Sequence, residues 1–459
     1  MRRDLIHSLR GNRSAIAFFA GWAMDATPFR KLHKNGYDIY LFYDYRTVEP
    51  TLYEELFQRY DKVAVVAWSF GVAVANTLIS TREETRIAIN GTAQGVDNKL
   101  GLPKPYNDLT LRRLSPETLA TFYHRVFSDD AGDTFFANPP RRPIDELAEE
   151  LRSLGDTRFP APSPCWDKVY VSDSDLIIPP ANQIRSWEDF GPEIIAGGAH
   201  GIDFQKVIDS DIVNKNIVAQ RFTRKAQSYE NHADVQRSMA SELMRLLGQN
   251  GVSVTGKDIL EVGIGTGFLT RLYCGANPSS VTAVDLADSA TLKAVLTNSG
   301  CNFKGEILTA DAEQFVAGKT ECYDLILTAS TIQWFNSQRL FLANCTAALR
   351  KGGILAIATF APGTFHEISD ITRSALKYYP VEWYKRNAPI GLQLIDSHED
   401  SVVLRFDDAR RLLEHISLTG VNAVSHQPST VSHTINLLKR LPHEPTLTYN
   451  PIYLIFRKL

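Results

Sequence analysis

Two series of short β-rich segments, each alternating with helix-like segments, limit the folds that are open to this chain. In the first half, the β-rich segments lie at 15–20, 37–43, 62–68, 86–90, 168–172 and 193–197. In the second half, they lie at 258–263, 280–285, 303–308, 323–329, 353–360, 401–406 and 446–456. Strands that alternate with helices are typical of a parallel, doubly wound sheet. We therefore predict an α/β fold for each half.

The length and the helix distribution predict two domains. The 459 residues exceed the usual size of one domain, and a helix-rich passage at 212–248 precedes the second series. We place an N-terminal domain at 1–209 and a C-terminal domain at 210–459. Within the first domain, residues 103–155 contain no good strand but have helical spacing, which predicts a helical cap over the edge of the sheet.

The composition excludes several classes of protein. The net charge is −3, so the chain has no overall attraction to nucleic acid, and no segment reaches the ~18 apolar residues of a membrane span. The apolar run 15–20 after the basic N-terminus is too short for a secretory signal peptide. The five cysteines form no CxxC pair, which favours a reducing compartment without structural zinc. We expect a cytoplasmic protein that holds no metal.

A small hydroxyl side chain lies at the junction of a strand and a helix in "VVAWSFGVAVAN", residues 65–76. A nucleophilic serine is held out from a sheet by such a turn, which tolerates only small residues two positions before and after the serine. Ala67 and Gly71 flank Ser69 in this way, with Ala in place of the first glycine of G-x-S-x-G. The alternative is that Ser69 caps the helix that starts at Gly71.

Two later stretches supply partners for Ser69 in the order Ser, Asp, His that is found in α/β-hydrolases. His200 lies in a Gly-rich turn after the last strand of the first half. Asp175 follows an earlier strand and precedes "LIIPP". We prefer Asp175 to Asp173 as the acid, since Asp173 can be explained as the cap of its turn.

The sequence also offers donors for an oxyanion hole, which stabilises the negative charge that forms on an ester oxygen during attack. Such a hole uses the backbone N–H that follows the serine and one from a loop after an early strand. Phe70 and Trp22, the latter in "FFAGWAMD", occupy these positions.

Residues 1 to about 205 resemble the BioG type of esterase, an α/β-hydrolase that hydrolyses pimeloyl-[acyl-carrier protein] methyl ester in biotin synthesis. The resemblance is carried by "FFAGWAMDATPF", "VVAWSFGVAVAN", "SDSDLIIPPANQ" and "GGAHGIDF". It implies that Ser69 attacks the methyl ester, that His200 transfers the proton and that Asp175 orients the imidazole. Basic residues of the cap would bind the acidic carrier protein, unless they only form a solvated face: Arg112, Arg113, Arg141 and Arg142.

A glycine turn between a strand and a helix, "DILEVGIGTGFLT", begins the second α/β series. Turn glycines let the backbone approach a ligand closely. Asp285 ends the next strand, 18 residues after Gly267, where a carboxylate can hold ribose hydroxyls. Asp311 follows the third strand, beside the expected position of an adenine. The candidate cofactor residues are Glu261, Gly263, Gly265, Gly267, Asp285 and Asp311.

These residues favour S-adenosylmethionine as the cofactor, with NAD as the rival. Glu261 at the start of the glycine loop and the strand-ending "YDLILTAST" at 323–331 are the features that favour it. Methyl transfer to an ionised carboxylate needs no general base, so the site mainly aligns the reactants and excludes water. The lack of an obvious catalytic dyad in this half is therefore consistent with a carboxyl O-methyltransferase.

Residues of about 216–459 resemble the BioC type of malonyl-[acyl-carrier protein] O-methyltransferase, which has a class I Rossmann-like fold. The resemblance is carried by "FTRKAQSYENHADVQ", "ILEVGIGTGFLT", "STIQWF", "FAPGTFHEI" and "LTYNPIYLIFRK". It implies that Tyr229 lies over the cofactor and that Gln333, Trp334 and His366 border the acceptor. Packing and capping are the alternative roles of these four residues.

Together, the resemblances predict a bifunctional enzyme of biotin biosynthesis whose partner is an acyl carrier protein. One half would methylate malonyl-[acyl-carrier protein], or malonyl-CoA, and the other would hydrolyse pimeloyl-[acyl-carrier protein] methyl ester to methanol and the free acid. One alternative is a small-ester serine hydrolase fused to a small-molecule O-methyltransferase of secondary metabolism. Another is that the hydrolase half only docks the carrier protein, against which the complete set Ser69, Asp175 and His200 argues.

Overall fold

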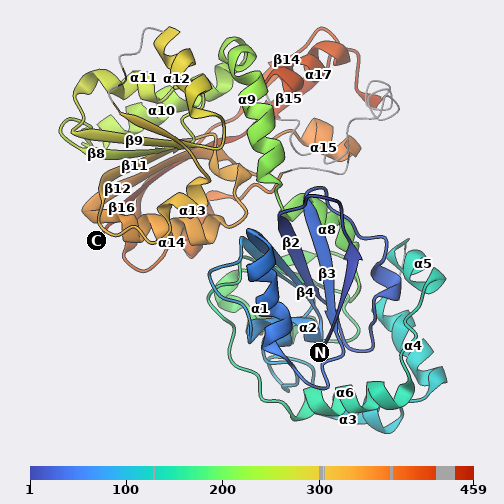
Figure 1. Ribbon diagram of the computed structural model, residues 1–459. Helices are drawn as coiled ribbons and strands as arrows, with labels where there is room; N and C mark the ends of the chain where they lie inside the picture. Colours follow the sequence, from blue (N-terminus) through green and yellow to red (C-terminus); the bar gives the residue numbers. More distant parts are fainter. Residues whose placement is uncertain (128–129, 299–302, 304, 373–375, 420–439) are drawn as a thin grey trace. The chain divides into compact units, whose positions relative to one another are not determined.

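The computed structural model describes residues 1–459 except 128–129, 299–302, 304, 373–375 and 420–439. The chain divides into two compact units, Met1–Ile212 and Val213–Leu459 (Figure 1). The division falls between residues 212 and 213, compared with 209 and 210 for the domain boundary predicted from the sequence.

The N-terminal unit contains a seven-stranded sheet in which only the first strand runs antiparallel to its neighbour. The strands β2 to β5 are buried along nearly their whole length, as expected for a sheet that is covered on both faces. In spatial order, the strands are β1 (Arg2–His7), β3 (Tyr37–Tyr43), β2 (Ser14–Phe19), β4 (Lys62–Trp68), β5 (Thr85–Ile89), β6 (Lys168–Ser172) and β7 (Glu193–Ile195).

Helices of the N-terminal unit follow the strands, except for a group of four between β5 and β6. The group consists of α3 (Lys104–Arg112), α4 (Pro116–Val126), α5 (Asp130–Ala137) and α6 (Ile144–Asp156). Helix α6 buries the face that carries Leu147, Glu150, Leu151 and Leu154. The remaining helices are α1 (Pro50–Arg59), α2 (Phe70–Asn76), α7 (Pro180–Ser186), α8 (Phe204–Asp211) and the short η1 (Thr27–Phe29) and η2 (Glu188–Phe190).

The C-terminal unit contains a second seven-stranded sheet, in which five parallel strands are followed by two that close one edge. β16 runs antiparallel to both of its neighbours. In spatial order, the strands are β10 (Glu306–Thr309), β9 (Ser280–Asp285), β8 (Asp258–Val262), β11 (Tyr323–Ala329), β12 (Leu349–Phe360), β16 (Pro451–Lys458) and β13 (Leu392–Glu399). A separate two-stranded sheet pairs β14 (Val402–Arg405) with β15 (Thr446–Tyr449).

The helices of the C-terminal unit lie between these strands or precede them. Two long helices, α9 (Lys215–His232) and α10 (Asp234–Gln249), come before β8. The others are α11 (Thr270–Tyr273), η3 (Cys274–Ala276), α12 (Ser289–Asn298), α13 (Ala312–Val316), η4 (Ile332–Trp334), α14 (Gln338–Ala348), α15 (His366–Thr372), α16 (Val381–Asn387) and α17 (Ala409–Leu418).

Two strands were not predicted, and one predicted strand is divided. β1 and β13 lie at sheet edges and carry many polar residues, so they lack the apolar run of a buried strand. The predicted strand 446–456 forms β15 and β16, separated at Asn450. Of the predicted strand 303–308, the part from Glu306 belongs to β10, and position 304 lies outside the described residues.

Candidate functional site

Ser69 lies at a sharp turn between β4 and α2, with a backbone φ of +58°. This left-handed conformation is uncommon for a residue with a Cβ atom and is found at strained functional turns. Close packing explains the glycine at position 71, because a Cβ atom on Gly71 would lie 2.3 Å from the carbonyl oxygen of Phe19. The Ser69 side chain makes no capping hydrogen bond to α2, so helix capping does not explain the serine.

The side chains of Ser69, His200 and Asp175 form one hydrogen-bonded chain. His200 Nε2 lies 2.8 Å from Ser69 Oγ, and His200 Nδ1 lies 2.7 Å from Asp175 Oδ2. An ionised carboxylate can only accept, so Nδ1 carries the proton toward Asp175 and Nε2 is left to accept from the Ser69 hydroxyl. All three residues are buried. The arrangement can take a proton from Ser69 Oγ and hold it on the imidazole.

Asp175 rather than Asp173 contacts His200. Asp175 Oδ1 accepts from the backbone N–H of Ile177 at 2.7 Å, and Gln183 Nε2 donates to Asp175 Oδ2 at 2.7 Å. Asp173 is exposed and accepts from the backbone N–H of Gly197, as a turn cap does. The carboxylate next to the imidazole is thus held by donors that keep it oriented.

Two further residues hold the His200 backbone, and the sequence analysis did not single out either. Trp68 Nε1 donates to the His200 carbonyl oxygen at 2.7 Å, and Asn90 Nδ2 donates to the same oxygen at 2.9 Å. Asn90 follows β5 and has a φ of +43°, a conformation that Asn adopts more readily than most residues. An Asn with positive φ after a strand has no sequence pattern that would have identified Asn90 in advance.

The loop after β2 lies directly against Ser69. A Cβ atom on Gly21 would lie 2.9 Å from Ser69 Cβ and 3.2 Å from Ser69 Oγ, so only glycine fits there. The peptide bond between Gly21 and Trp22, which carries the Trp22 N–H, therefore begins beside the Ser69 hydroxyl. Phe70 is the first residue of α2, where a backbone N–H has no partner within its own helix.

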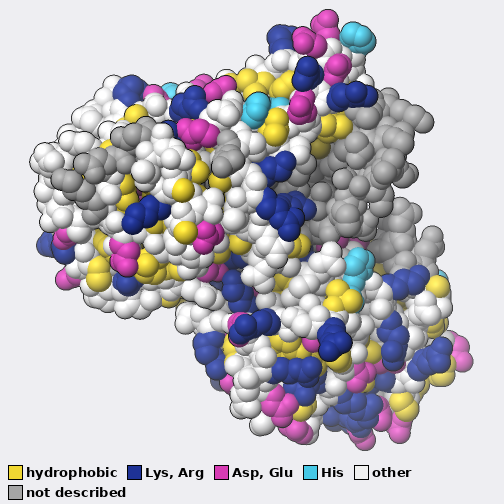
Figure 2. All heavy atoms as spheres, turned by 45° about the horizontal axis from the view of Figure 1, so that its top comes forward, with side chains coloured by type: hydrophobic (Ala, Val, Ile, Leu, Met, Phe, Trp, Pro, Cys, Tyr) yellow, Lys and Arg dark blue, Asp and Glu magenta, His cyan; other side chains and the backbone are white. Residues whose placement is uncertain are grey.

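The four arginines that were expected to bind a carrier protein differ in exposure. Arg112, Arg113 and Arg141 are exposed, and Figure 2 shows many Lys and Arg side chains on the viewed face of the N-terminal unit, with Asp and Glu among them. Arg142 is buried and pairs with Asp44 and Glu150. The expectation for Arg142 is therefore wrong, because its guanidinium is used inside the unit.

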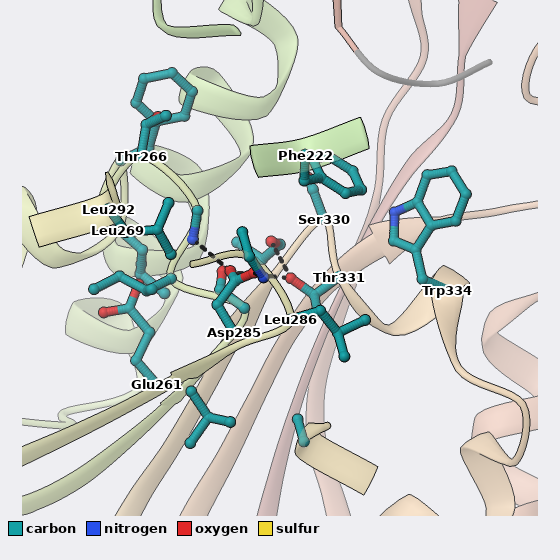
Figure 3. Close-up of a pocket in the computed structure, with 18 of the residues that line it drawn as sticks. Phe222, Glu261, Thr266, Leu269, Asp285, Leu286, Leu292, Ser330, Thr331 and Trp334 are labelled. Carbon is teal, nitrogen blue, oxygen red and sulfur yellow. Dashed lines mark hydrogen bonds between the residues drawn. The ribbon is translucent and has the colours of Figure 1, made fainter. Parts of the chain in front are cut away.

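In the C-terminal unit, a cavity of about 990 Å³, including its open mouth, lies at the carboxyl ends of β8, β9 and β11 (Figure 3). This edge of a parallel sheet is the usual place for a ligand. All six predicted cofactor residues lie near it, and five of them line it. The lining includes Phe222, Tyr229, Glu261, Gly263, Gly265, Asp285, Leu286, Asp311, Thr331 and Trp334.

The glycine turn after β8 forms the floor of this cavity. Gly263, Gly265 and Gly267 all have positive φ, at +74°, +50° and +83°. A Cβ atom on Gly263 would lie 2.0 Å from Thr331 Oγ1, and one on Gly267 would lie 2.2 Å from Leu296 Cδ2. Side chains at these two positions would therefore clash with the surrounding protein, whereas a Cβ atom on Gly265, which lines the cavity, would meet nothing within 4 Å. Gly267 does not itself line the cavity but closes the turn.

Two carboxylates shape the cavity from β8 and β9. Asp285 ends β9, and its Oδ2 accepts from the Gly265 N–H at 2.9 Å, which fixes it beside the glycine turn (Figure 3). Glu261 is buried and accepts hydrogen bonds from Thr270 and Tyr273. Burial raises the pKa of Glu261 to about 7. Burial also raises the pKa of Asp285, although backbone N–H donors oppose this.

Asp311 is held by the first turn of α9. Lys215 Nζ lies 2.6 Å from Asp311 Oδ1 and also contacts Glu313, and these two carboxylates raise the pKa of the buried lysine despite its desolvation. The Asn214 side chain caps α9 by accepting from the N–H of Ile217. Val213 N donates to Asn336 Oδ1 at 2.7 Å. The segment before α9 is therefore tied to one wall of the cavity.

A smaller cavity of about 330 Å³ shares several of these walls. Tyr229 and Trp334 line both cavities, and Gln333 lines the smaller one. His366 is exposed at the start of α15 and is not among the described lining residues of either cavity. The lining of the smaller cavity also includes Gln236, Ser330, Phe360, Phe365 and Tyr378.

Gln236 is a polar residue of this region that the sequence analysis missed. It lies on α10, is 6% exposed and lines both cavities. Its Oε1 has no hydrogen-bond partner among the described residues. Gln333, by contrast, is engaged: its Nε2 donates to the Ser330 carbonyl oxygen at 2.8 Å and its Oε1 accepts from Thr359 at 3.3 Å.

In the part of the chain that the structure describes, no three His, Cys, Asp or Glu side chains come together as metal ligands. No described helix combines the length and the apolar character that crossing a bilayer requires.

Comparisons with known families agree with the two units. Residues 4–202 match the family described as pimeloyl-ACP methyl esterase BioG, and residues 260–357 match a methyltransferase domain. With the sheet of the C-terminal unit, the second match confirms the predicted Rossmann-like methyltransferase fold and S-adenosylmethionine as its cofactor.

Individual relatives extend these matches. The malonyl-[acyl-carrier protein] O-methyltransferase of Bacteroides fragilis is 31% identical over 468 residues, which cover 97% of this chain and 93% of that protein. The protein of the same name from Bacteroides helcogenes is 28% identical and covers 53% of this chain and 98% of its own length. The crystal structure of BioG from Haemophilus influenzae is 26% identical, covers 44% of this chain and 94% of that one, and has a TM-score of 0.37.

The match to the B. fragilis protein runs through both units, and the BioG match ends before the methyltransferase domain begins. The chain therefore belongs to the malonyl-[acyl-carrier protein] O-methyltransferase family, with a BioG segment preceding its methyltransferase domain.

Proposed function

We propose that this chain adds a methyl group to the free carboxylate of malonyl-[acyl-carrier protein] and removes the same kind of group from pimeloyl-[acyl-carrier protein] methyl ester. The N-terminal unit, with an α/β-hydrolase fold and a helical cap formed by α3 to α6, is the serine esterase. The observation that carries this assignment is the hydrogen-bonded chain from Ser69 through His200 to Asp175.

In the esterase reaction, Ser69 Oγ attacks the carbonyl carbon of the methyl ester while His200 Nε2 accepts its proton. The N–H groups of Trp22 and Phe70 donate to the oxygen that becomes negative. The imidazolium returns the proton to the departing methoxide, so methanol leaves and an acyl-Ser69 remains. A water molecule, deprotonated by His200, then releases the carboxylate and restores Ser69. Asp175 keeps the imidazole oriented throughout.

In the methyltransferase reaction, bound S-adenosylmethionine supplies a methyl group on a sulfonium. The glycine turn at 263–267 lets the backbone approach the cofactor, which is supported by the open space beside Gly265 at the cavity wall. The Asp285 carboxylate would hold ribose hydroxyls, and Asp311 lines the adenine end. The methyl acceptor is a carboxylate that attacks as the anion, so no residue has to remove a proton.

The smaller cavity is the proposed site for the malonyl group. Its aromatic walls exclude water, and its polar groups are neutral among the described lining residues. Burial raises the pKa of Tyr229 and Tyr378, so both hydroxyls stay protonated and can donate to a carboxylate. The Gln236 amide, with Oε1 unpaired, can turn so that its NH2 group donates as well.

The two activities suit each other chemically. A methyl ester hides the charge of a malonyl carboxylate, and hydrolysis restores that charge on a longer acyl chain. The full-length match to a malonyl-[acyl-carrier protein] O-methyltransferase favours this substrate over the small molecules of secondary metabolism.

Each half of the proposal can be tested in the full-length protein. The wild type should convert malonyl-[acyl-carrier protein] to its methyl ester with S-adenosylmethionine and should release methanol from pimeloyl-[acyl-carrier protein] methyl ester. Ser69→Ala should lose the second reaction and keep the first, whereas Gly263→Ala should do the reverse. Ester cleavage that survives Ser69→Ala would remove the serine esterase from the proposal.

A further inference from the structure

The loop 20–25, which joins β2 to η1 beside Ser69, is tied down by side chains from distant parts of the N-terminal unit. Tyr45 Oη donates to the Ala20 carbonyl oxygen at 2.8 Å, and Tyr123 Oη donates to that of Ala23 at 3.0 Å. Trp22 Nε1 donates to the Leu147 carbonyl oxygen on α6 at 2.9 Å. Each of these contacts restrains a different residue of the loop.

The restraint is needed because the loop does not follow a regular conformation. Ala23 has a φ of +66°, which is unfavourable for a residue with a Cβ atom, and Ala23 and Met24 are both buried. A strained buried segment keeps its shape only where its surroundings over-determine it. The contacts to Tyr123 and α6 come from the helices between β5 and β6, so these helices help to set the shape of the loop.

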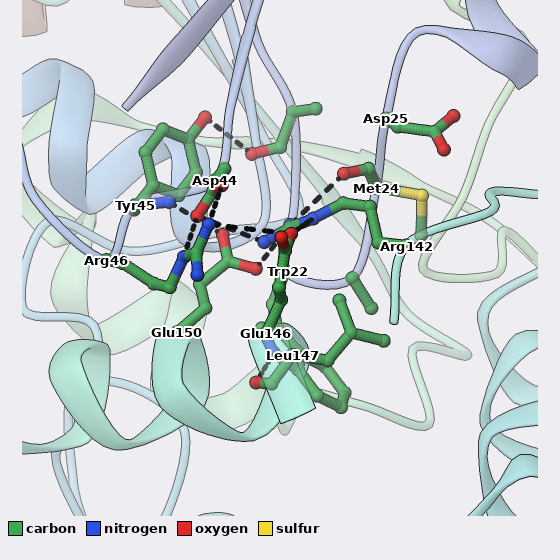
Figure 4. Close-up of polar contacts among 12 residues, drawn as sticks. Trp22, Met24, Asp25, Asp44, Tyr45, Arg46, Arg142, Glu146, Leu147 and Glu150 are labelled. Atoms are coloured by element: carbon green, nitrogen blue, oxygen red, sulfur yellow. Dashed lines mark hydrogen bonds and ion pairs between the residues drawn. The ribbon is translucent and has the colours of Figure 1, made fainter. Parts of the chain in front are cut away.

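Arg142 joins this loop to a buried cluster of charges (Figure 4). Its Nη1 donates to the Met24 carbonyl oxygen at 3.3 Å and to Glu150 Oε2 at 2.6 Å, and its Nη2 lies 3.0 Å from Asp44 Oδ1. The Glu150 carboxylate in turn accepts from the Tyr45 backbone N–H at 2.8 Å. One guanidinium thus links the loop, the end of β3 and helix α6.

The surrounding ion pairs fix the position of Arg142 further. Arg46 binds both oxygens of Asp44, at 2.9 and 2.8 Å, and Arg2 Nε lies 3.1 Å from Asp44 Oδ2. The Asp44, Glu150 and Arg142 side chains are 4%, 0% and 3% exposed. Charges buried to this extent give little net stability, because desolvation offsets their attraction. Their value lies in the defined geometry that several mutually paired groups impose.

We infer that Arg142 is a positioning residue for the esterase, holding the 20–25 loop so that the Trp22 N–H stays aimed at the oxygen that becomes negative next to Ser69. This inference rests on the proposed esterase function. It assigns to the buried arginine a role in the rate of the chemical step, while substrate binding depends on other groups. The described polar contacts of Arg142 are to Met24, Asp44, Glu146 and Glu150, and Ser69 is not among them.

The test compares Arg142→Met and Arg142→Lys with the wild type on a small methyl ester that carries no carrier protein. Arg152→Met is the matched control, because Arg152 lies on α6 and is exposed. Active sites are counted by the burst of a fluorophosphonate that labels Ser69. Removing one oxyanion donor in a serine hydrolase lowers kcat about 10²–10³-fold, so for a donor that is misplaced rather than removed we expect a fall of about 10–100-fold in Arg142→Met.

The expected signature is a split between kcat and KM. Arg142→Met should keep KM within about twofold while its affinity for a trifluoromethyl ketone, which forms a tetrahedral anion on Ser69, falls by the same factor as kcat. Arg142→Lys should fall between Arg142→Met and the wild type, and Arg152→Met should equal the wild type. Unchanged kcat per labelled site in Arg142→Met, or a loss confined to KM, would overturn the inference.

A second variant keeps the test decisive if Arg142→Met does not fold. Glu150→Gln preserves the shape of its side chain and removes one charge that holds Arg142, so it should lower kcat and ketone affinity together, by less than Arg142→Met. Wild-type values in both Glu150→Gln and Arg142→Lys would overturn the inference. If the wild type itself cleaves no ester, the esterase proposal fails, an outcome distinct from failure of the positioning role.

Discussion

The indole Nε1 of Trp68 donates a hydrogen bond to the carbonyl oxygen of His200, 132 residues further along the chain. The residue before Ser69 therefore holds the backbone of the histidine that contacts the Ser69 hydroxyl. Both residues are almost completely buried, and their rings lie 5.4 Å apart. The proposed nucleophile and base are thus coupled through the main chain as well as through their side chains.

Replacement of Trp68 by Phe should remove the hydrogen bond that holds the His200 backbone. The variant loses the buried hydrogen bond and leaves a small cavity, which together cost about 1–3 kcal/mol of stability. We expect kcat for ester hydrolysis to fall about tenfold, since His200 is then less well placed. Steady-state kinetics and thermal unfolding measure the two effects. The methyltransferase rate serves as an internal control and should not change.

The choice between the two aspartates can be decided by a matched pair of variants. Asp175→Asn should lower kcat about 10⁴-fold, because the amide no longer holds the imidazole in the required tautomer. Asp173→Asn should leave kcat within about twofold, since Asp173 is exposed and bonds the Gly197 N–H. The opposite ranking in a methanol-release assay would show that the acid has been assigned to the wrong residue.

Gly263 is expected to be essential for cofactor binding. An alanine there would place Cβ 2.0 Å from Thr331 Oγ1 in a backbone conformation with φ of +74°. We expect Gly263→Ala to weaken S-adenosylmethionine binding at least tenfold by isothermal titration calorimetry. Gly275→Ala is the control, because a Cβ atom on Gly275 meets nothing within 4 Å. Equal affinity in the two variants would contradict this account of the turn.

Glu261 should make the stability of the C-terminal unit depend on pH. Burial raises its pKa to about 7 from 4.5, so the folded state binds a proton that the unfolded state releases at lower pH. The free energy of unfolding should therefore fall as the pH rises from 4.5 to 7, by up to about 3 kcal/mol from this group. Glu261→Gln should lack that part of the fall. Calorimetric unfolding without cofactor checks this, and identical slopes in both proteins would refute it.

Gln236 should contribute to acceptor binding and not to cofactor binding. Gln236→Leu removes one hydrogen-bonding amide, worth about 1–1.5 kcal/mol, so the KM for malonyl-[acyl-carrier protein] should rise about tenfold while the affinity for S-adenosylmethionine is retained. Gln249→Leu changes an exposed residue at the end of the same helix and should behave as the wild type. A raised KM in the control alone would place the acceptor elsewhere.

The parts of this protein that could be predicted are those with a local pattern. The apolar strand before Ser69 and the glycine turn at 263–267 could be predicted, because a nucleophile turn and a cofactor-binding turn each need small residues at fixed spacing. The preference for Asp175 followed from its loop, and the structure brings that residue to His200.

The parts that could not be predicted depend on contacts between distant residues. Arg142 was expected to bind the carrier protein or to belong to a solvated face, but Asp44, which lies 98 positions earlier, pairs with it in the interior. Asn90 and Gln236 carry no pattern of their own, and their importance comes from where their side chains point. β1 was missed because its polar residues resemble those of a loop, and the sequence does not show that this segment pairs with β3.

The ion pair between Lys215 and Asp311 has a practical consequence for experiments that separate the two units. Val213, Asn214 and Lys215 follow immediately after the division between the compact units, yet each is bonded within the C-terminal one. A free-standing methyltransferase domain must keep all three residues, because a start at residue 216 would remove the buried Lys215 ammonium that pairs with Asp311 and Glu313. Loss of methyl transfer in such a shortened fragment would then reflect the cut, not a need for the esterase.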